Sequence, residues 1–94
     1  MPNQNQQEIK VQDNFPGAEY ANAMQVSHNK EEFLLTFLNL VPPAGRVCGK
    51  ILTSPGHMKR MVAALSENLA RYETSFGKIE EAEAPNKEIG FKGE

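Results

Sequence analysis

The chain has 94 residues, 23% of them charged, a formal net charge of −2 and a single cysteine. This length allows one domain, and one cysteine excludes an internal disulfide and a zinc site built from several cysteines. No apolar run approaches the roughly 20 residues of a transmembrane helix, and no secretory signal is visible at the start. We therefore expect a cytoplasmic protein that makes no membrane contact and needs no cofactor.

The two ends of the chain differ in composition from its middle. Residues 1–7 are mostly amide-bearing, and residues 80–94 are acidic with few apolar side chains. Such segments bury too little surface to offset the entropy lost on ordering. We therefore predict a disordered arm over 1–7, a single domain over 8–79 and a flexible acidic tail over 80–94. A core built from roughly seventy residues is marginal, and oligomerisation is the supplement left to it.

Apolar and polar residues alternate with a period of two in the first half of this domain, which predicts strands. The run EIKVQ (8–12) alternates weakly and is either a first strand or part of the arm. Stronger runs follow at YANAMQVSH (20–28), FLLTFLNLV (33–41) and RVCGKILT (46–53), separated by the turn-forming segments NFPGAE and VPPAGR. Short connections between consecutive strands predict an antiparallel meander of three or four strands.

The segment HNKEE (28–32) raises the question of a metal site, because His28 precedes Glu31 by three residues. The zinc signature H-x-x-E-H needs a helix to bring such residues onto one face. Here the flanking residues alternate as in strands, and Asn29 and Lys30 favour a turn. We interpret the segment as a solvated turn, with a short helical turn as a variant, and His28 as a residue at the strand end.

Residues 54–77 predict one long amphipathic helix. Ser54 is a favoured N-cap, Pro55 suits the first helical position and Gly77 suits the C-terminal end. An apolar stripe with spacings of three and four contains Met58, Met61, Val62, Leu65, Leu69, Tyr72 and Phe76. The predicted fold is α+β, an antiparallel three- to four-stranded meander followed by one long C-terminal helix packed on the sheet.

The strand FLLTFLNLV is apolar on both faces, whereas one helix covers only one face of a sheet. We therefore hypothesise a homodimer or a higher homo-oligomer in which a second copy covers the remaining face. Asn68 lies beside the apolar stripe of the helix and could fix the register of such a contact. The candidate interface residues are Phe33, Leu34, Leu35, Phe37, Leu38, Leu40 and Asn68.

Three segments of the chain resemble a small prokaryotic family catalogued as domain of unknown function 3467. They are YAN (20–22), VSHNKEEFLLTF (26–37) and SPGHMKRMVAALSENLARYETSFGKI (54–79), and the resemblance covers about residues 8–79 in one register. Thr36 stands where members often carry aspartate, and Gly56 stands where an acidic residue is common. The resemblance implies a fold and no chemistry, since the family has no established activity.

No acidic residue occurs between Phe33 and Ser66, so the middle of the chain is mildly basic. This asymmetry suggests, as an alternative function, a nucleic-acid or other anion surface that the acidic tail could cover. The lack of exposed aromatic residues for base stacking and the sequence pI of about 5.7 count against it. The candidate anion-binding residues are Arg46, Lys50, His57, Lys59 and Arg60.

The motifs of common enzymes are absent from the sequence. It contains no glycine-rich phosphate loop, no Ser-His-Asp order and no paired carboxylates that a cleft could use. We therefore predict no catalytic residues and no metal site. The preferred interpretation is a non-catalytic, homo-oligomeric interaction or scaffold module that binds itself and an unidentified protein, with nucleic-acid binding possible but not favoured.

Overall fold

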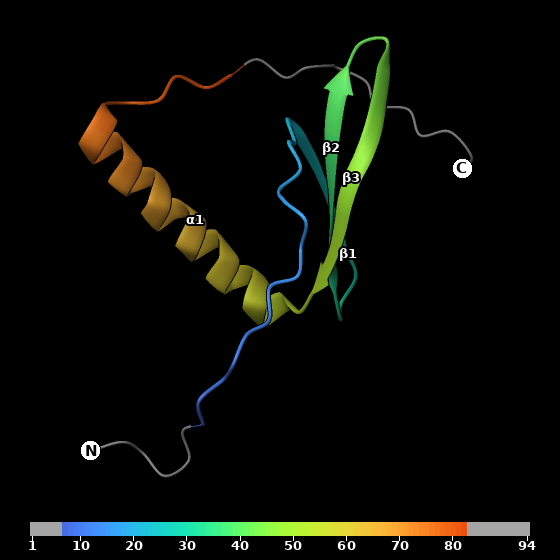
Figure 1. Cartoon of the computed structure of the whole chain (residues 1–94), viewed down its shortest axis with the longest axis vertical. Coiled ribbons are helices and arrows are strands. Elements are labelled where there is room, and N and C mark those ends of the chain that lie inside the picture. Colours follow the sequence, from blue (N-terminus) through green and yellow to red (C-terminus); the bar gives the residue numbers. More distant parts are fainter. Residues whose placement is uncertain (1–6, 83–94) are drawn as a thin grey trace.

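A computed structural model describes residues 7–82 of the chain and contains three strands and one helix. These are β1 (Ala23–His28), β2 (Phe33–Val41), β3 (Ala44–Thr53) and α1 (Pro55–Phe76). The strands form an antiparallel sheet in the order β1-β2-β3, and α1 follows the last of them (Figure 1). The predicted α+β meander with one C-terminal helix is confirmed in its three-stranded form. The predicted arm and tail lie mostly outside the described residues.

The sequence left open whether the segment EIKVQ (8–12) is a first strand or part of the N-terminal arm. It forms no strand in the structure, which agrees with the second alternative. Residues 7–22 run without regular structure before β1, on the same side of the sheet as α1 in Figure 1. The chain turns between β2 and β3 at Pro42 and Pro43, which are joined by a cis peptide bond. Both turn residues are proline, which cannot donate to a ladder and therefore ends the strand at this point.

Strand β2 is the central strand, and it pairs with β3 along its whole length and with β1 from Phe33 to Leu38. Its pairing with β3 shifts by one residue between Phe37 and Leu38, where Gly49 and Val47 are the respective partners and Cys48 is skipped. Cys48 is thus the extra residue of a β-bulge in β3, which bends that strand and increases its twist.

The side chain of Asn22 extends the sheet beyond the end of β1. Its Nδ2 donates to the carbonyl oxygen of Leu40 at 2.9 Å, and its Oδ1 accepts from the Leu40 N–H at 2.8 Å. A carboxamide carries one donor and one acceptor side, like a peptide group, so Asn22 occupies the place of the next ladder residue. The polar groups of Leu40, a buried residue, are thereby paired.

All buried side chains among the described residues belong to β2. Leu35 lies on one face of the strand, while Thr36, Leu38 and Leu40 lie on the other, because successive side chains alternate between faces. Leu38 is the most completely buried of them, with 2% of its surface exposed. The core of the single chain therefore consists of side chains of the central strand, which β1 and β3 flank on its two edges.

Helix α1 forms where its local signals place it. The Ser54 Oγ accepts a hydrogen bond from the His57 N–H at 3.2 Å, and Pro55 occupies the first helical position. At the other end Gly77 has φ +98°, a conformation that favours glycine, and its N–H donates to the Glu73 carbonyl at 2.9 Å. Both helix boundaries predicted from the sequence are confirmed.

The packing of α1 differs from the expectation that it would lie against the sheet. No residue of the helix is buried, and α1 diverges from the sheet after its first turns (Figure 1). Met58 and Met61, near the start of the helix, are half-buried, whereas the apolar residues further along are exposed. Local capping and propensity determine that a helix forms, but its position depends on long-range contacts that this single chain does not make.

The first prediction concerns the hydrogen bonds of Asn22. Replacing Asn22 by alanine leaves the N–H and C=O of Leu40 without these partners, and we expect the free energy of unfolding to fall by about 1–2 kcal/mol. Urea denaturation at a fixed protein concentration measures this loss. Gln25→Ala, in the exposed middle of β1, is the matched control and should cost no more than about 0.5 kcal/mol. Equal losses in the two variants would contradict the proposed role of Asn22.

Candidate interaction surface

A stripe of exposed apolar side chains runs along α1. Its side chains after the first turns are between 50% and 75% exposed: Val62, Leu65, Leu69, Tyr72 and Phe76. The rings of Tyr72 and Phe76 contact each other with centroids 5.0 Å apart. Singly exposed apolar residues are normal at a protein surface, but a continuous stripe of this kind marks an interaction site.

The sheet presents further apolar side chains beside β2. Met24 and Val26 of β1 and Ile51 of β3 are about half exposed, and the pairing register places all three on one face with Leu35 and Phe37. On the opposite face Leu52 is also exposed. Both faces of the sheet therefore carry apolar surface toward their edges, while the middle of β2 is covered.

The interface candidates named from the sequence have different environments in the structure. Leu35, Leu38 and Leu40 are buried within the chain, while Phe33, Leu34 and Phe37 are half-buried. Sequence reasoning placed the unmatched apolar surface on β2, and the structure places most of it on α1. The signal that could have identified it is the apolar stripe of the helix itself, which requires a cover that the sequence does not name.

Asn68 lies on the exposed surface of α1, one residue before Leu69 of the stripe. Its Nδ2 donates to the Ala64 carbonyl of the preceding turn at 3.3 Å. It is thus placed where a second helix lying along the stripe would meet it.

The segment HNKEE is a hairpin turn, as predicted. Strand β1 ends at His28, and the N–H of Asn29 donates to the Glu32 carbonyl at 3.0 Å. The Asn29 Oδ1 accepts from the backbone N–H groups of Glu31 and Glu32, both at 2.8 Å, which holds the turn. The His28 ring lies against Phe33 with centroids 5.2 Å apart. The polar residues of this segment therefore serve the turn and the strand end.

The basic candidates do not gather into one patch. Arg46 forms an ion pair with Glu19, and the hydrogen bond and charge of Glu19 raise the pKa of Arg46. Arg46 lies opposite Asn39 and Lys50 opposite Thr36, and these β2 positions are three apart, so the two side chains lie on opposite faces. Neither face of β3 thus combines both charges.

The other basic candidates lie in the first turns of α1. The Arg60 Nη2 is 3.0 Å from the His57 Nδ1, so that ring nitrogen acts as the acceptor when the guanidinium donates. Lys59 is exposed beside them, and no acidic residue occurs in the first turn. His57, Lys59 and Arg60 therefore form a small basic group at the helix start, separate from Arg46 and Lys50.

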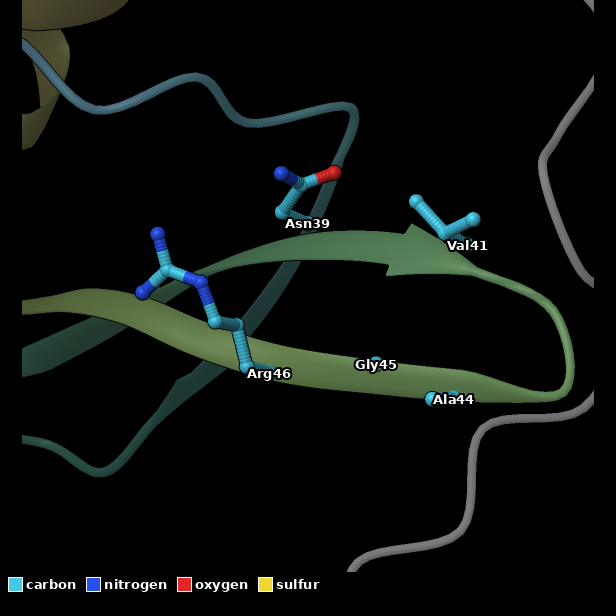
Figure 2. Close-up of a pocket in the computed structure, with 5 residues that line it drawn as sticks. All are labelled: Asn39, Val41, Ala44, Gly45 and Arg46. Atoms are coloured by element: carbon cyan, nitrogen blue, oxygen red, sulfur yellow. The ribbon is translucent and has the colours of Figure 1, made fainter.

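The described surface has a shallow hollow at each end of the sheet. One, of about 250 Å³, is at the turn end of β2 and β3 and is lined by Asn39, Val41, Ala44, Gly45 and Arg46. Figure 2 shows the side chains of Asn39, Val41 and Arg46 on the same side of this hairpin. The other, of about 290 Å³, adjoins the His28 turn. Its lining includes the imidazole of His28 and the carboxylate of Glu32, both exposed on the turn.

Within residues 7–82, no group of three or more histidine, cysteine, aspartate or glutamate side chains is placed to hold a metal ion. In the same part of the chain, no helix is both long and apolar enough to cross a membrane. The site with the strongest physical signal is therefore the apolar surface of α1 and the neighbouring strands.

Comparison with known families gives one match. Residues 1–81 match the family described as protein of unknown function, DUF3467. No curated protein and no solved structure matches the chain.

The second prediction concerns the turn that was a candidate site. Asn29→Ala removes the oxygen that accepts two backbone hydrogen bonds, and we expect unfolding to become easier by about 1 kcal/mol. Asn29→Asp keeps an acceptor oxygen and should retain most of this stability in high salt, which screens repulsion from the neighbouring glutamates. Urea denaturation compares the variants. A loss in the aspartate variant as large as in the alanine variant would show that the acceptor does not hold the turn.

Proposed function

Because the chain belongs to the DUF3467 family, which is described as having unknown function, we propose from its structure that it is a non-catalytic, homo-oligomeric interaction module. The observation that carries the proposal is the stripe of α1, whose side chains from Val62 to Phe76 stay half exposed or more in the single chain. A second copy of the chain is the partner that we propose for this stripe. A cytoplasmic location belongs to the same proposal, since an unpaired cysteine suits a reducing compartment.

The spacing of the stripe favours another helix as its cover. Alternating steps of four and three residues connect Met58, Val62, Leu65, Leu69, Tyr72 and Phe76. This is the heptad spacing of helices that pack side by side with knobs in holes. Packing against a sheet does not require heptad spacing, whereas the α1 helix of a second copy has the same heptad spacing.

An antiparallel pair of α1 helices gives each of these six residues a partner in one register. If Leu65 of each copy meets Leu69 of the other, Val62 meets Tyr72 and Met58 meets Phe76 in the same register. All six stripe positions then have a partner on the other helix. An isologous contact of this kind closes on itself around a two-fold axis and forms a dimer.

Charged and polar residues beside the stripe agree with the antiparallel arrangement. Lys59 and Glu73 are fourteen positions apart and lie on the same flank of the helix, one near each end. In an antiparallel pair, the same flanks of the two helices face each other, so Lys59 of one copy approaches Glu73 of the other. Asn68 lies on the opposite flank near the centre, where it approaches the same residue of the second copy.

The small core is the reason that the single chain gains from association. Leu35, Leu38 and Leu40 are its buried apolar residues among those described. Burying a large apolar side chain contributes about 1.5–3 kcal/mol to stability. Burial of even part of each of the six stripe residues in a dimer would therefore add substantially to the free energy of unfolding of each copy. The stability of the folded chain and its self-association are therefore expected to be coupled.

The third prediction tests this helix pairing. We expect the wild-type chain to form a dimer or a larger oligomer at micromolar concentration, as measured by size-exclusion chromatography with light scattering. Leu65→Lys places a charge in the middle of the stripe without lowering helix propensity, and should raise the dissociation constant at least about tenfold.

Thr74→Lys is the matched control, because it adds the same charge on the side of α1 away from the stripe. Circular dichroism verifies that both variants keep their helix. A wild-type chain that stays monomeric throughout the micromolar range would overturn the proposed function. A Thr74 variant that dissociates as readily as the Leu65 variant would show that the stripe is not the contact.

The rival function is nucleic-acid binding, and the observation that favours it is the basic group at the start of α1. His57, Lys59 and Arg60 lie there without an acidic residue in the first turn. The fourth prediction is that labelled single- and double-stranded oligonucleotides show no binding at low salt. Binding that weakens as salt rises and is lost in Lys59→Gln would instead support the rival, since phosphate contacts release counterions.

A further inference from the structure

We propose that two copies of the chain also pair through the outer edges of their β1 strands, forming one continuous six-stranded sheet. This inference deepens the proposed self-association and depends on it, because it names a second contact between the same two partners. Three observations carry it: the pairing pattern of β1, its lack of the features that protect sheet edges, and its lack of lysine, arginine, aspartate and glutamate.

The backbone groups at the outer edge of β1 are identified by its pairing with β2. In an antiparallel pair, hydrogen-bonded and non-hydrogen-bonded residue pairs alternate. Asn29 bonds Glu32 at the turn, so Ser27, Gln25 and Ala23 also bond their partners on β2. The backbone N–H and C=O groups of the intervening residues point to the outer edge: Met24, Val26 and His28.

This outer edge has no strand beside it among the described residues, since the sheet has the order β1-β2-β3. Residues Met24 to His28 are all exposed. An unpaired edge of this kind is a template for another strand, and natural proteins protect such edges with lysine, proline, bulges or covering segments. The strand AMQVSH has no lysine, no proline and no bulge.

The other edge of the sheet differs from β1 in each of these respects. Strand β3 contains the bulge at Cys48 and the basic residues Arg46 and Lys50. If two β3 strands paired antiparallel around their centre, these like charges of the two copies would lie close together, which is unfavourable. Two β1 strands bring no formal charges together at neutral pH. The edge chemistry therefore selects β1 for self-pairing.

The outward groups also determine the register of the contact. Hydrogen-bonded pairs must join two outward-facing residues. Each of Met24, Val26 and His28 in one copy therefore pairs with one of the same three residues in the other copy. The register that uses all three places Val26 opposite Val26 and Met24 opposite His28 across the two-fold axis. It forms three hydrogen-bonded pairs, whereas a shift by two residues in either direction removes one of them within the strand.

The symmetry of this contact is compatible with the proposed helix pairing. A two-fold axis that relates adjacent antiparallel strands is perpendicular to their sheet, so equivalent faces of both copies lie on one side. Both α1 helices therefore stand on the same side of the six-stranded sheet and run in opposite directions about the axis. This is the relative direction that the stripe and its flanking charges favour.

Cysteine cross-linking tests the register directly, in a chain whose Cys48 is replaced by alanine. In the proposed register the Cα atoms of the two Val26 residues are about 5.5 Å apart, within the range of about 4.4–6.8 Å that a disulfide needs. The two Met24 residues lie four positions from alignment, about 13 Å apart along the strand. We expect Val26→Cys to form a cross-linked dimer under mild oxidation and Met24→Cys to form little.

Proline substitution tests the same contact without cross-linking. Val26→Pro removes an outward N–H and leaves the bonds to β2 intact, so the fold should be retained while the dissociation constant of the dimer rises at least about tenfold. The measurements are light scattering for association and circular dichroism for the fold. If this variant fails to fold, the two cysteine variants decide the question alone.

The outcomes separate this inference from the proposed function. Equal cross-linking of both cysteine variants, or none in either, overturns the β1 contact. If the wild-type chain is nevertheless an oligomer that Leu65→Lys dissociates, the helix pairing stands and only the edge contact is wrong. A wild-type chain that is monomeric by light scattering overturns both. Cross-linking confined to Val26 in an oligomeric wild type supports the edge contact.

Discussion

Backbone pairing of β2 on both of its edges is the constraint on which the rest of the structure depends. This strand is paired with β3 along its whole length and with β1 from Phe33 to Leu38, and all buried side chains among the described residues project from it. Asn22 continues the same ladder with its side chain, and the turn held by Asn29 brings β1 into register. The outer strands and α1 are therefore organised around a core that is one strand wide. Such a core leaves much apolar surface uncovered in the described residues, which is the observation that supports the proposed self-association.

Local signals in the sequence predicted most of the elements. Alternation with a period of two located the strands, and Ser54 and Gly77 marked both ends of α1. Asn29 and Lys30 marked the turn in the segment that also resembles a metal-binding signature. These features depend on interactions within a few residues, which a sequence displays directly. The resemblance of the chain to its family agreed with the same register and added no chemistry.

Long-range contacts were the part that the sequence did not predict. Asn22 lies within the YAN segment of the sequence, but its bonds to Leu40 span eighteen positions along the chain. The ion pair between Glu19 and Arg46 spans twenty-seven, and it changed the meaning of a basic candidate. The position of α1 was expected on the sheet because an amphipathic helix must bury its stripe somewhere. Amphipathicity states that cover is required, and it does not state which molecule supplies it.

The junction between β3 and α1 has a mechanical consequence. Ser54 alone separates the two elements, and Pro55 behind it has a fixed φ, so few backbone angles set the direction of the helix. A helix of 22 residues is about 33 Å long, so a rotation of about 10° at this junction displaces its far end by about 6 Å. Small changes in the backbone angles near Ser54 therefore move the far end of α1, and the apolar stripe on it, by several ångströms relative to the sheet. The direction of α1 can in this way change without altering the sheet.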